Sequence, residues 1–435
     1  MTLCPRAAAR SGACGRPRSS TDVPLRSGAA VHARRRAEAI APRLESCRMR
    51  TVFLSVAFAV AFAPGAFAAP ARAPEAYLAT IIDDAPPPLP RGLAPSERVP
   101  LPQRPRGAAP PGGPLRAIAE YEGNAGIMIR WGNFNALHTS MVVPLTTADP
   151  PSDVWVVVDG AAQENSARNV LQGGGADLAH VHFVIAASDS VWIRDYGPRF
   201  VQHRGTRAIV DHAYNRPRPN DDLVPFAVAG QWDEPIFEIP LVHGGGNFHL
   251  FRNRDAFMTR LISNENPGVG EPEILADFRA WEGLEVTLFD PFPASYDSTQ
   301  HIDMWMLPLA DHKVLIGEYD AAQGGGVPKT VTDAAALELA GRGYAVYRTP
   351  GWRASGTHFT YTNSVIVNNV VLICRFDGYS SQNAAALATY EAALPDHVIV
   401  PVDCSDIIWM SGAIHCIVMH VPDLLFRDDA DDPIL

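Results

Sequence analysis

Short apolar runs alternate with longer amphipathic stretches from about residue 115 to about residue 426. The short runs are rich in Val and Ile and are therefore predicted to be strands, at 154–160, 181–188, 207–214, 313–320, 344–350, 364–376 and 397–403. The longer stretches predict helices at 163–172, 272–283, 332–343 and 382–395, of which the last three end near Gly or Pro. Strands and helices that interleave over about 310 residues indicate an α/β fold, for which a doubly wound parallel sheet is the default expectation.

The chain before residue 115 follows no such pattern and divides by composition into three segments. Residues 49–68 have a basic start, an apolar run and a small-x-small end, which predicts a secretory signal peptide and hence a secreted or periplasmic protein; the alternative is an N-terminal membrane anchor. Because a signal peptide begins a chain, we interpret residues 1–48 as an over-long reading frame. Residues 69–114 are dense in Pro and Ala, so we expect an extended linker or pro-segment in which no core can form.

Charge is distributed unevenly along the chain. Eleven Arg against three acidic residues give the first 50 residues a net charge of +8, so the rest must carry −19 to reach the formal net charge of −11. A domain of that charge, followed by an acidic tail at 427–435, is not expected to bind nucleic acid generically or to associate stably with a membrane. The Gly-rich stretches 244–248 and 324–327 fit neither a phosphate-binding loop nor a dinucleotide motif, and C-x-x-C and H-E-x-x-H metal motifs are lacking. We therefore expect no metal and no cofactor.

Cleavage after Ala68 would leave three cysteines, Cys374, Cys404 and Cys416. This odd number leaves at least one thiol unpaired in a compartment that permits disulfides. Cys374 and Cys404 both lie in apolar strand-like runs, so we predict two buried thiols rather than a bridge between them. In either case Cys416 is the candidate free thiol.

The sequence around Cys416 raises the question of what could activate it. If residues 413–420 form a strand, His415 and Cys416 point to opposite faces, so the adjacent histidine cannot be the partner. His301 and Asp303 are two residues apart and project to the same side of an extended segment. A histidine held by a carboxylate is suited to acid–base work near neutral pH, which makes this pair the strongest candidate partner.

A second polar cluster, Arg194 and Asp195, lies between an apolar run and a Gly-Pro turn and beside Trp192. Such charges at a strand end are often simply solvated or paired, and that is the alternative interpretation. Together with the thiol and the His301–Asp303 pair, however, Asp195 provides a second carboxylate next to an aromatic wall. Two carboxylates and an apolar surface suit a planar guanidinium group.

Six motifs occur in a fixed order over 115–425: WIRDYGP, YNRPRPND, GGGNF, HIDMW, YTNS and GAIHC. In this order and at these separations they resemble the agmatine deiminase and bacterial (porphyromonad-type) peptidylarginine deiminase family. The resemblance implies the fold of the guanidino-group-modifying enzymes, an α/β-propeller (pentein) of five blades around a pseudo-fivefold axis. This expectation replaces the doubly wound sheet and makes residues 115–426 a single catalytic domain.

The resemblance also implies a role for each candidate residue. Cys416 would attack the guanidinium carbon, Asp195 and Asp303 would hold the guanidinium nitrogens, and His301 would protonate the departing ammonia. His301 would then deprotonate the water that hydrolyses the S-alkylthiouronium, which gives a ureido product such as citrulline. Asn363 in YTNS matches a position beside the thiol, although by itself it would be interpreted as a turn residue.

Arg216 and Arg218 point the same way if their segment is extended, and such a pair can clamp a carboxylate. In the bacterial peptidylarginine deiminases, the resemblance implies, the matching pair binds the carboxylate of a C-terminal arginine. We therefore favour peptidyl or free arginine as the guanidino substrate. Agmatine deiminase, which would yield N-carbamoylputrescine, is the close alternative; an amidinotransferase and a catalytically silent binding module on the same fold also remain open.

One departure from the family pattern concerns the turn after GGGNF, where Phe251 and Arg252 stand in place of an expected Asp-Gly. Asp255 is the candidate replacement. A propeller domain without further modules is expected to be a monomer or a simple dimer.

Overall fold

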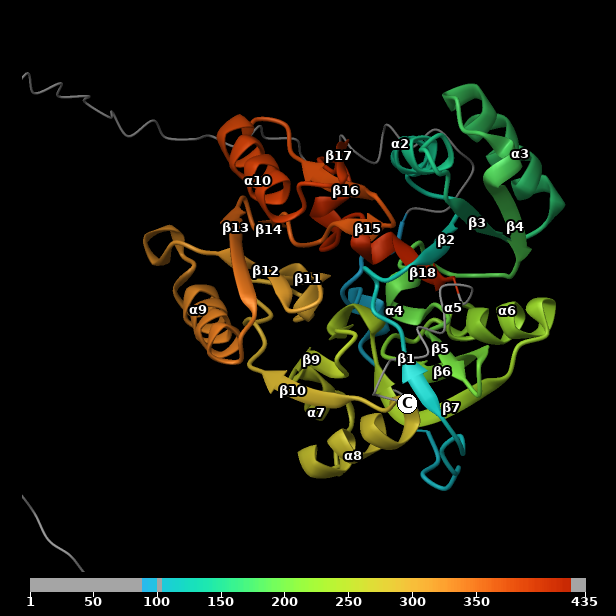
Figure 1. Ribbon diagram of the computed structural model, residues 1–435, viewed down its shortest axis with the longest axis horizontal. Coiled ribbons are helices and arrows are strands. Elements are labelled where there is room, and N and C mark those ends of the chain that lie inside the picture. The colour runs from blue at the N-terminus through green and yellow to red at the C-terminus, as the bar shows by residue number, and fades with distance from the viewer. Residues whose placement is uncertain (1–87, 100–103, 424–435) are drawn as a thin grey trace, which may run out of the picture. The chain divides into compact units, whose positions relative to one another are not determined.

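The computed structural model describes residues 88–99 and 104–423 (Figure 1). These residues belong to one structural unit, Ala66–Leu435. The predictions for residues 1–48, for the signal peptide at 49–68 and for the tail at 427–435 fall outside the described residues. Within the described ranges no helix has both the length and the apolar character that crossing a membrane would require.

The strands of the described ranges form five small sheets. The first contains β1 (Leu115–Ala117), β5 (Phe200–His203), β6 (Thr206–Tyr214) and β7 (Ile236–His243). The second contains β8 (His249–Leu250), β9 (Asp255–Thr259) and β10 (Glu285–Phe289), and the third β11 (Met306–Ala310), β12 (Lys313–Glu318), β13 (Ala345–Ala354) and β14 (Thr357–Thr360). The fourth contains β15 (Val365–Val367), β16 (Val370–Arg375) and β17 (Val398–Asp403), and the fifth β18 (Val418–Pro422), β2 (Asn124–Arg130), β3 (Asp153–Val158) and β4 (Val181–Ile185).

Every sheet combines an antiparallel pair with a parallel pair, for example β15 against β16 and β16 against β17. The chain is therefore a mixed α/β protein with several small sheets, and the default expectation of one doubly wound sheet is wrong. Periodicity could not distinguish the two arrangements, because a parallel pair joined by a helix occurs in both.

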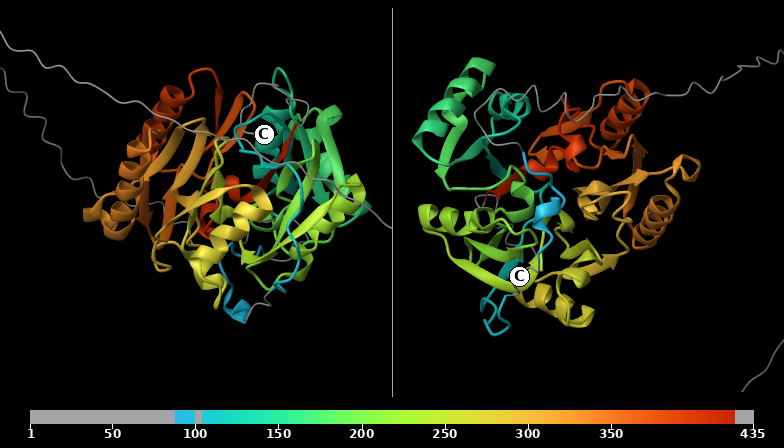
Figure 2. Two further views of the ribbon diagram at one scale, coloured as in Figure 1. Left: turned by 60° about the horizontal axis from the view of Figure 1, so that its bottom comes forward. Right: turned by 180° about the vertical axis from the view of Figure 1, so that it is seen from behind.

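Each parallel pair is joined through helices, as the geometry of a parallel connection requires. The helices are α2 (Asn135–Thr146), α3 (Ala161–Gly174), α4 (Ile193–Tyr196), α5 (Pro219–Asp222), α6 (Val224–Trp232), α7 (Leu261–Glu265), α8 (Glu271–Glu282), α9 (Gly326–Gly341) and α10 (Ser380–Ala393). Short 3₁₀ turns occur at η1 (Pro95–Glu97), η2 (Leu178–His180), η3 (Gly245–Asn247), η4 (Ile302–Met304), η5 (Ala321–Gln323), η6 (Ile408–Met410) and η7 (His415–Ile417). The sheets lie around a common centre and the long helices cover their outer sides (Figures 1 and 2).

The four predicted helices are confirmed as α3, α8, α9 and α10, with ends that differ by a few residues. Helix α8 shows why the prediction succeeds: Pro272 stands in its first turn, and Gly283 ends it with a φ of +71°, a conformation that favours glycine. Five consecutive residues of β16, Val370 to Cys374, are buried, which explains its continuous apolar run.

The prediction of two buried thiols is wrong for Cys374 and Cys404, which form a disulfide with a Cα–Cα distance of 5.4 Å. Cys374 pairs in register with Val402 in the parallel strands β16 and β17, and Cys404 follows two residues later. The sequence shows that both strands are apolar, but only the register brings the two sulfurs together. Cys416 is the free cysteine of the described residues, and it is buried.

Removing this disulfide should lower stability substantially. The bridge closes a sequence separation of 30 residues, and cross-links of this size restrict the unfolded chain by about 3 kcal/mol. We expect the double variant Cys374→Ala/Cys404→Ala to lose about that much free energy of unfolding in guanidinium chloride titrations. The unsubstituted protein in reductant is the control, and an unchanged midpoint in the variant would contradict the prediction.

Candidate active site

The candidate catalytic residues come from distant parts of the chain and meet between the sheets. Asp195 lies on the short helix α4, Asp303 on the turn η4 with His301 immediately before it, and Cys416 on the turn η7. All four side chains are fully buried. The sequence correctly indicated that these residue types belong together, but it could not show what they surround.

A residue that the sequence analysis missed lies at their centre. Arg91, from the Pro-rich segment, inserts its side chain between the two carboxylates and is itself fully buried. Asp195 accepts from Nε at 3.0 Å and from Nη2 at 2.9 Å, while Asp303 accepts from Nη1 at 3.0 Å and from Nη2 at 2.8 Å. The two carboxylates thus hold one planar guanidinium in paired hydrogen bonds.

The same guanidinium contacts the other two candidate residues. Nη1 of Arg91 donates to Sγ of Cys416 at 2.6 Å, and Nη2 lies 2.8 Å from Nδ1 of His301. A thiol, an imidazole and two carboxylates therefore all contact the guanidinium of one arginine, which is in peptide linkage.

Residues 88–99 of the Pro-rich segment join no apolar core but are bound to the folded domain, and they cross the middle of the molecule in the view from behind (Figure 2). The backbone N–H of Arg91 donates to the carbonyl of Met410 at 3.0 Å, and the indole of Trp192 donates to the carbonyl of Leu89 at 2.8 Å. Trp192 was expected to form an apolar wall, and it lies beside this segment. No periodic pattern in the sequence predicts these contacts, because each one depends on a single residue of the segment contacting a group of the folded domain.

Burial and the neighbouring charges shift the pKa values of the ionisable residues in the site. Burial alone would favour the neutral carboxyl groups, but the Arg91 guanidinium holds the pKa of Asp195 well below its usual range and also lowers the pKa of Asp303. Both carboxylates are therefore ionised near neutral pH. Burial lowers the pKa of His301, so its ring is neutral there, and Nδ1 can accept from Nη2.

Burial raises the pKa of the Cys416 thiol well above its usual range, and both carboxylates act in the same direction, whereas Arg91 opposes them. The reactive thiolate is consequently disfavoured unless a cation lies against the sulfur. The guanidinium 2.6 Å from Sγ is such a cation.

Alkylation of Cys416 provides a pH-dependent check. In the Arg91→Ala variant the thiol loses this guanidinium, so its pKa rises and the neutral thiol persists to higher pH. We expect iodoacetamide to react slowly at pH 7 and faster as the pH increases, and a cationic haloacetamidine to react about 100-fold faster at pH 7 because it brings its own positive charge. Mass mapping of Cys416 measures both rates; equal rates for the two reagents would contradict the assignment.

Asn363 fixes the turn that carries the thiol. Its Oδ1 accepts from the backbone N–H groups of Ala413 at 3.1 Å and Cys416 at 3.3 Å, and lies 3.1 Å from Sγ. Its Nδ2 donates to the carbonyl of Asp303 at 3.4 Å. Asn363 therefore links the Cys416 and Asp303 turns.

Two glycines, Gly246 and Gly412, allow the backbone to pass close to the side chains of the site. A Cβ on Gly246 would lie 1.7 Å from Nη2 of Arg91 and within 2.8 Å of both carboxylates. A Cβ on Gly412 would lie 2.7 Å from the Trp192 ring and 3.0 Å from both Cδ of Arg91 and Sγ of Cys416. Both positions require glycine for space, not for backbone conformation.

The expectation of a strand over 413–420 is wrong at its start, because the 3₁₀ turn η7 precedes β18, which begins at Val418. His415 and Cys416 both lie on this turn, so strand alternation does not place them on opposite faces. His415 reaches the site through Asp303, whose Oδ2 lies 3.0 Å from its Nδ1, while its Nε2 lies 2.9 Å from Glu120. His415 thus orients the carboxylate from behind.

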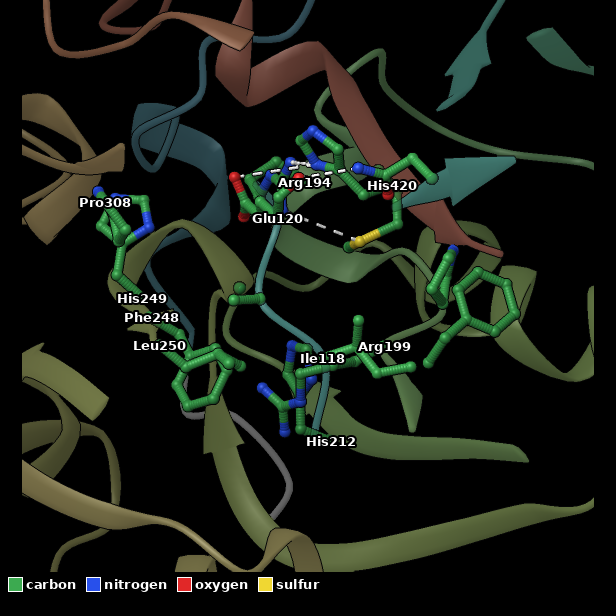
Figure 3. A pocket seen from close by; sticks show the side chains of 16 residues that line it. Ile118, Glu120, Arg194, Arg199, His212, Phe248, His249, Leu250, Pro308 and His420 are labelled. Carbon is green, nitrogen blue, oxygen red and sulfur yellow. Dashed lines mark hydrogen bonds and ion pairs between the residues drawn. The ribbon is translucent and has the colours of Figure 1, made fainter. Parts of the chain in front are cut away.

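Glu120 also lines a small cavity, together with Arg194, His249 and His420 (Figure 3). Arg194 donates to Glu120 at 2.6 Å and lies 2.9 Å from Nδ1 of His420. Glu120, His249 and His415 bring possible metal-ligand atoms within 4.8 Å of one another. Both ring nitrogens of His415 are already engaged, so a metal would have to displace Glu120 or Asp303. Glu120 and His415 instead form a hydrogen-bonded chain that supports Asp303.

Arg216 and Arg218 also contact the Pro-rich segment. Nε of Arg216 donates to the carbonyl of Arg91 at 3.1 Å. Arg218 donates to the carboxylate of Glu97 from Nε at 2.6 Å and from Nη2 at 2.9 Å, and it donates to the carbonyl of Pro90 at 2.7 Å. The pair thus binds main-chain and acidic groups of a peptide next to its arginine.

Asp255, the candidate replacement for the acidic residue expected after GGGNF, is engaged elsewhere. It pairs with Arg342 at 2.7 Å and accepts from the Tyr344 hydroxyl at 2.5 Å. Its carboxylate thus supports Arg342 and Tyr344 rather than the Arg91 guanidinium.

Comparison with known proteins identifies the family. The model of the Porphyromonas-type peptidyl-arginine deiminases matches residues 117–422. The chain belongs to this family. It is accordingly a hydrolase of the peptidylarginine and agmatine deiminase type, which acts on carbon–nitrogen bonds of linear amidines.

Individual relatives of this deiminase are distant but matched over most of their length. The agmatine deiminase of Ectopseudomonas mendocina is 24% identical over 318 residues, which cover 62% of this chain and 83% of that protein. The solved agmatine deiminase of C. jejuni with substrate bound has a TM-score of 0.62 at 16% identity, covering 71% of this chain and 96% of its own. That of Enterococcus faecalis has a TM-score of 0.61 at 19% identity, with 73% and 100% covered. At these identities the structural likeness establishes the fold.

Proposed function

We propose that this deiminase hydrolyses the guanidinium of peptide-linked arginine to give citrulline and ammonia. One observation carries the proposal: the guanidinium of Arg91 lies between Asp195 and Asp303 with Nη1 2.6 Å from Sγ of Cys416. The site therefore accepts an arginine side chain whose backbone continues in both directions. We also propose that the five sheets are the five blades of the α/β-propeller, which the likeness to the solved deiminases supports.

The reaction begins when the Cys416 thiol gives its proton to the neutral ring of His301, which becomes an imidazolium, and the thiolate, in contact with the guanidinium, adds to Cζ. The Cζ–Nη2 bond then breaks, and Nη2 leaves as ammonia with a proton from the imidazolium of His301. Nη2 is assigned as the leaving nitrogen because it lies 2.8 Å from Nδ1 of His301. Asp195 and Asp303 keep the remaining thiouronium in place.

Water completes the cycle in the position that ammonia vacates. His301, now neutral, takes a proton from this water as its oxygen adds to Cζ. The Cζ–Sγ bond breaks, the imidazolium of His301 returns its proton to the Cys416 sulfur, and the remaining hydroxyl proton leaves with ammonia as ammonium. One water is consumed for each guanidinium converted into a ureido group and one ammonium ion.

Agmatine is the second candidate, and the names of the relatives favour it. Its terminal ammonium would lie toward Arg216 and Arg218, whose positive charges oppose it. A peptide instead presents carbonyl and carboxylate oxygens there, as Arg91 and Glu97 do. The charge of this side of the site therefore favours an arginine substrate.

Substrate choice is tested by ammonia release from four compounds: agmatine, free arginine, a peptide ending in arginine and a peptide with an internal arginine. Release from the peptides with little from agmatine supports the proposal. Release from agmatine alone would identify an agmatine deiminase. No release from any of them would point to an amidinotransferase or a silent binding module.

The double variant Arg216→Ala/Arg218→Ala should separate these substrates further. Loss of charged hydrogen bonds such as those to the Arg91 carbonyl and Glu97 is worth about 1.5–3 kcal/mol each, or about 3–6 kcal/mol for both, so we expect KM for peptides to rise about 100- to 10,000-fold. Turnover of agmatine, if measurable, should not fall. An equal loss on every substrate would mean that the pair only supports the fold.

We also propose that the enzyme acts outside the cytoplasm. The Cys374–Cys404 disulfide supports this, because such bridges persist in oxidising compartments.

A further inference from the structure

Residues 88–99 are held by contacts of Leu89, Pro90, Arg91 and Glu97, which distinguishes them from a passive linker. Besides the Arg91 side chain, the backbone of Arg91 bonds to Met410 and Arg216, and the carbonyls of Leu89 and Pro90 bond to Trp192 and Arg218. The 3₁₀ turn of this segment, η1, ends at Glu97, whose carboxylate accepts two hydrogen bonds from Arg218. The segment is bound as a peptide substrate would be, with one arginine in the reactive position.

From this arrangement we propose that Arg91 is a self-deimination site, and that its conversion to citrulline releases residues 88–99 from the active site. The inference rests on the proposed deiminase function. The docked segment is then an intramolecular enzyme–substrate complex: Cys416, His301 and the two carboxylates already contact the nitrogens of the guanidinium. The chemistry is the one described above, with Cζ of Arg91 losing Nη2 as ammonia and gaining its oxygen from water.

Release follows from the loss of charge. Arg91 brings one positive charge to two buried carboxylates, whereas citrulline is neutral and cannot donate ionic bonds to both. The Cys416 thiol would also lose the nearby cation that lowers its pKa. The modified segment should therefore dock more weakly, which opens the site to other arginines.

Before this single turnover, the segment competes with any added substrate. A tethered ligand acts at an effective concentration in the millimolar range, so it blocks weakly binding substrates efficiently. Arg98 provides a matched control within the same segment, because it carries the same charge but is exposed.

Mass mapping of the full chain tests the modification. We expect citrulline at position 91 and arginine at position 98, with one oxygen-18 atom at residue 91 when the protein refolds in labelled water. The Cys416→Ala variant should retain arginine at position 91. The rate of conversion should not change on dilution, because the reaction is intramolecular.

Binding tests the docking without relying on turnover. In the Cys416→Ala background, we expect the added variant Arg91→Ala to tighten binding of an arginine peptide at least 10-fold, whereas Arg98→Ala should leave it unchanged.

The two proposals fail in different ways. Arginine intact at position 91 in a preparation that releases ammonia from added peptides would overturn self-deimination while leaving the proposed function in place. Peptide binding equal in all three Cys416→Ala proteins would overturn the docking. Absence of conversion both at residue 91 and in every added guanidino compound would overturn the proposed function itself. Conversion at a rate proportional to protein concentration would overturn the intramolecular step.

Discussion

Cys416→Ala should abolish ammonia release, with a fall in kcat of about a million-fold or to background. The reason is that no other group in contact with the Arg91 guanidinium can form a covalent bond to its carbon: Asp195 and Asp303 are engaged in ion pairs, and His301 is placed to exchange protons. The sulfur is 2.6 Å from Nη1, so its removal eliminates the nucleophile and leaves the guanidinium bonds to both carboxylates intact.

The fold should survive this change, because only one small buried group is lost. The variant should keep its circular dichroism spectrum and still bind an arginine peptide once the Arg91 side chain is also removed. Activity retained in Cys416→Ala would rule out Cys416 as the nucleophile. Loss of the folded spectrum would leave only the alkylation of Cys416 to decide its role.

Gly246→Ala should reduce kcat/KM for arginine peptides at least about 100-fold, because displacements of about 1 Å in an active site have effects of that size. The added methyl group would lie 1.7 Å from the position of Nη2, so substrate and methyl cannot both occupy it. Asp195 and Asp303 cannot move away without losing their bonds to the guanidinium. The change therefore acts on the leaving nitrogen directly.

Gly230→Ala is the matched control for this substitution. Gly230 lies in α6, is exposed, and has nothing within 4 Å of its Cβ position. Alanine is preferred over glycine in a helix by roughly 0.5–1 kcal/mol, so this variant should keep full activity and gain slight stability. Comparable activity of Gly246→Ala and the unsubstituted protein would show that the guanidinium binds elsewhere.

Much of the candidate site could be predicted from local sequence. His301 and Asp303, two positions apart, were predicted to project to the same side of an extended segment, and their pairing at the site is correct although Asp303 lies on the turn η4. The aromatic and charged residues around Asp195 indicated a guanidinium site. Asn363 was matched only through the family motif, and its contacts with Cys416 explain why an amide is needed there. In each case a few neighbouring residues carry the information.

The errors share a physical cause, which is dependence on contacts between distant residues. The Cys374–Cys404 bridge depends on the parallel register of β16 and β17, which the apolar composition of the two strands does not encode. The link from His415 to Asp303 spans 112 positions and depends on a turn where alternation predicted a strand.

The amino-acid sequence alone determined the chemistry available to this protein: the α/β class, the principal helices, and a thiol, an imidazole and two carboxylates suited to a guanidinium. Periodicity and residue type carry that information because they are local. Only the tertiary structure decided which guanidinium lies in the site, because Arg91 and Cys416 are 325 positions apart and the Pro-rich segment has no periodic face of its own. Its position is set entirely by groups that the folded domain presents to it.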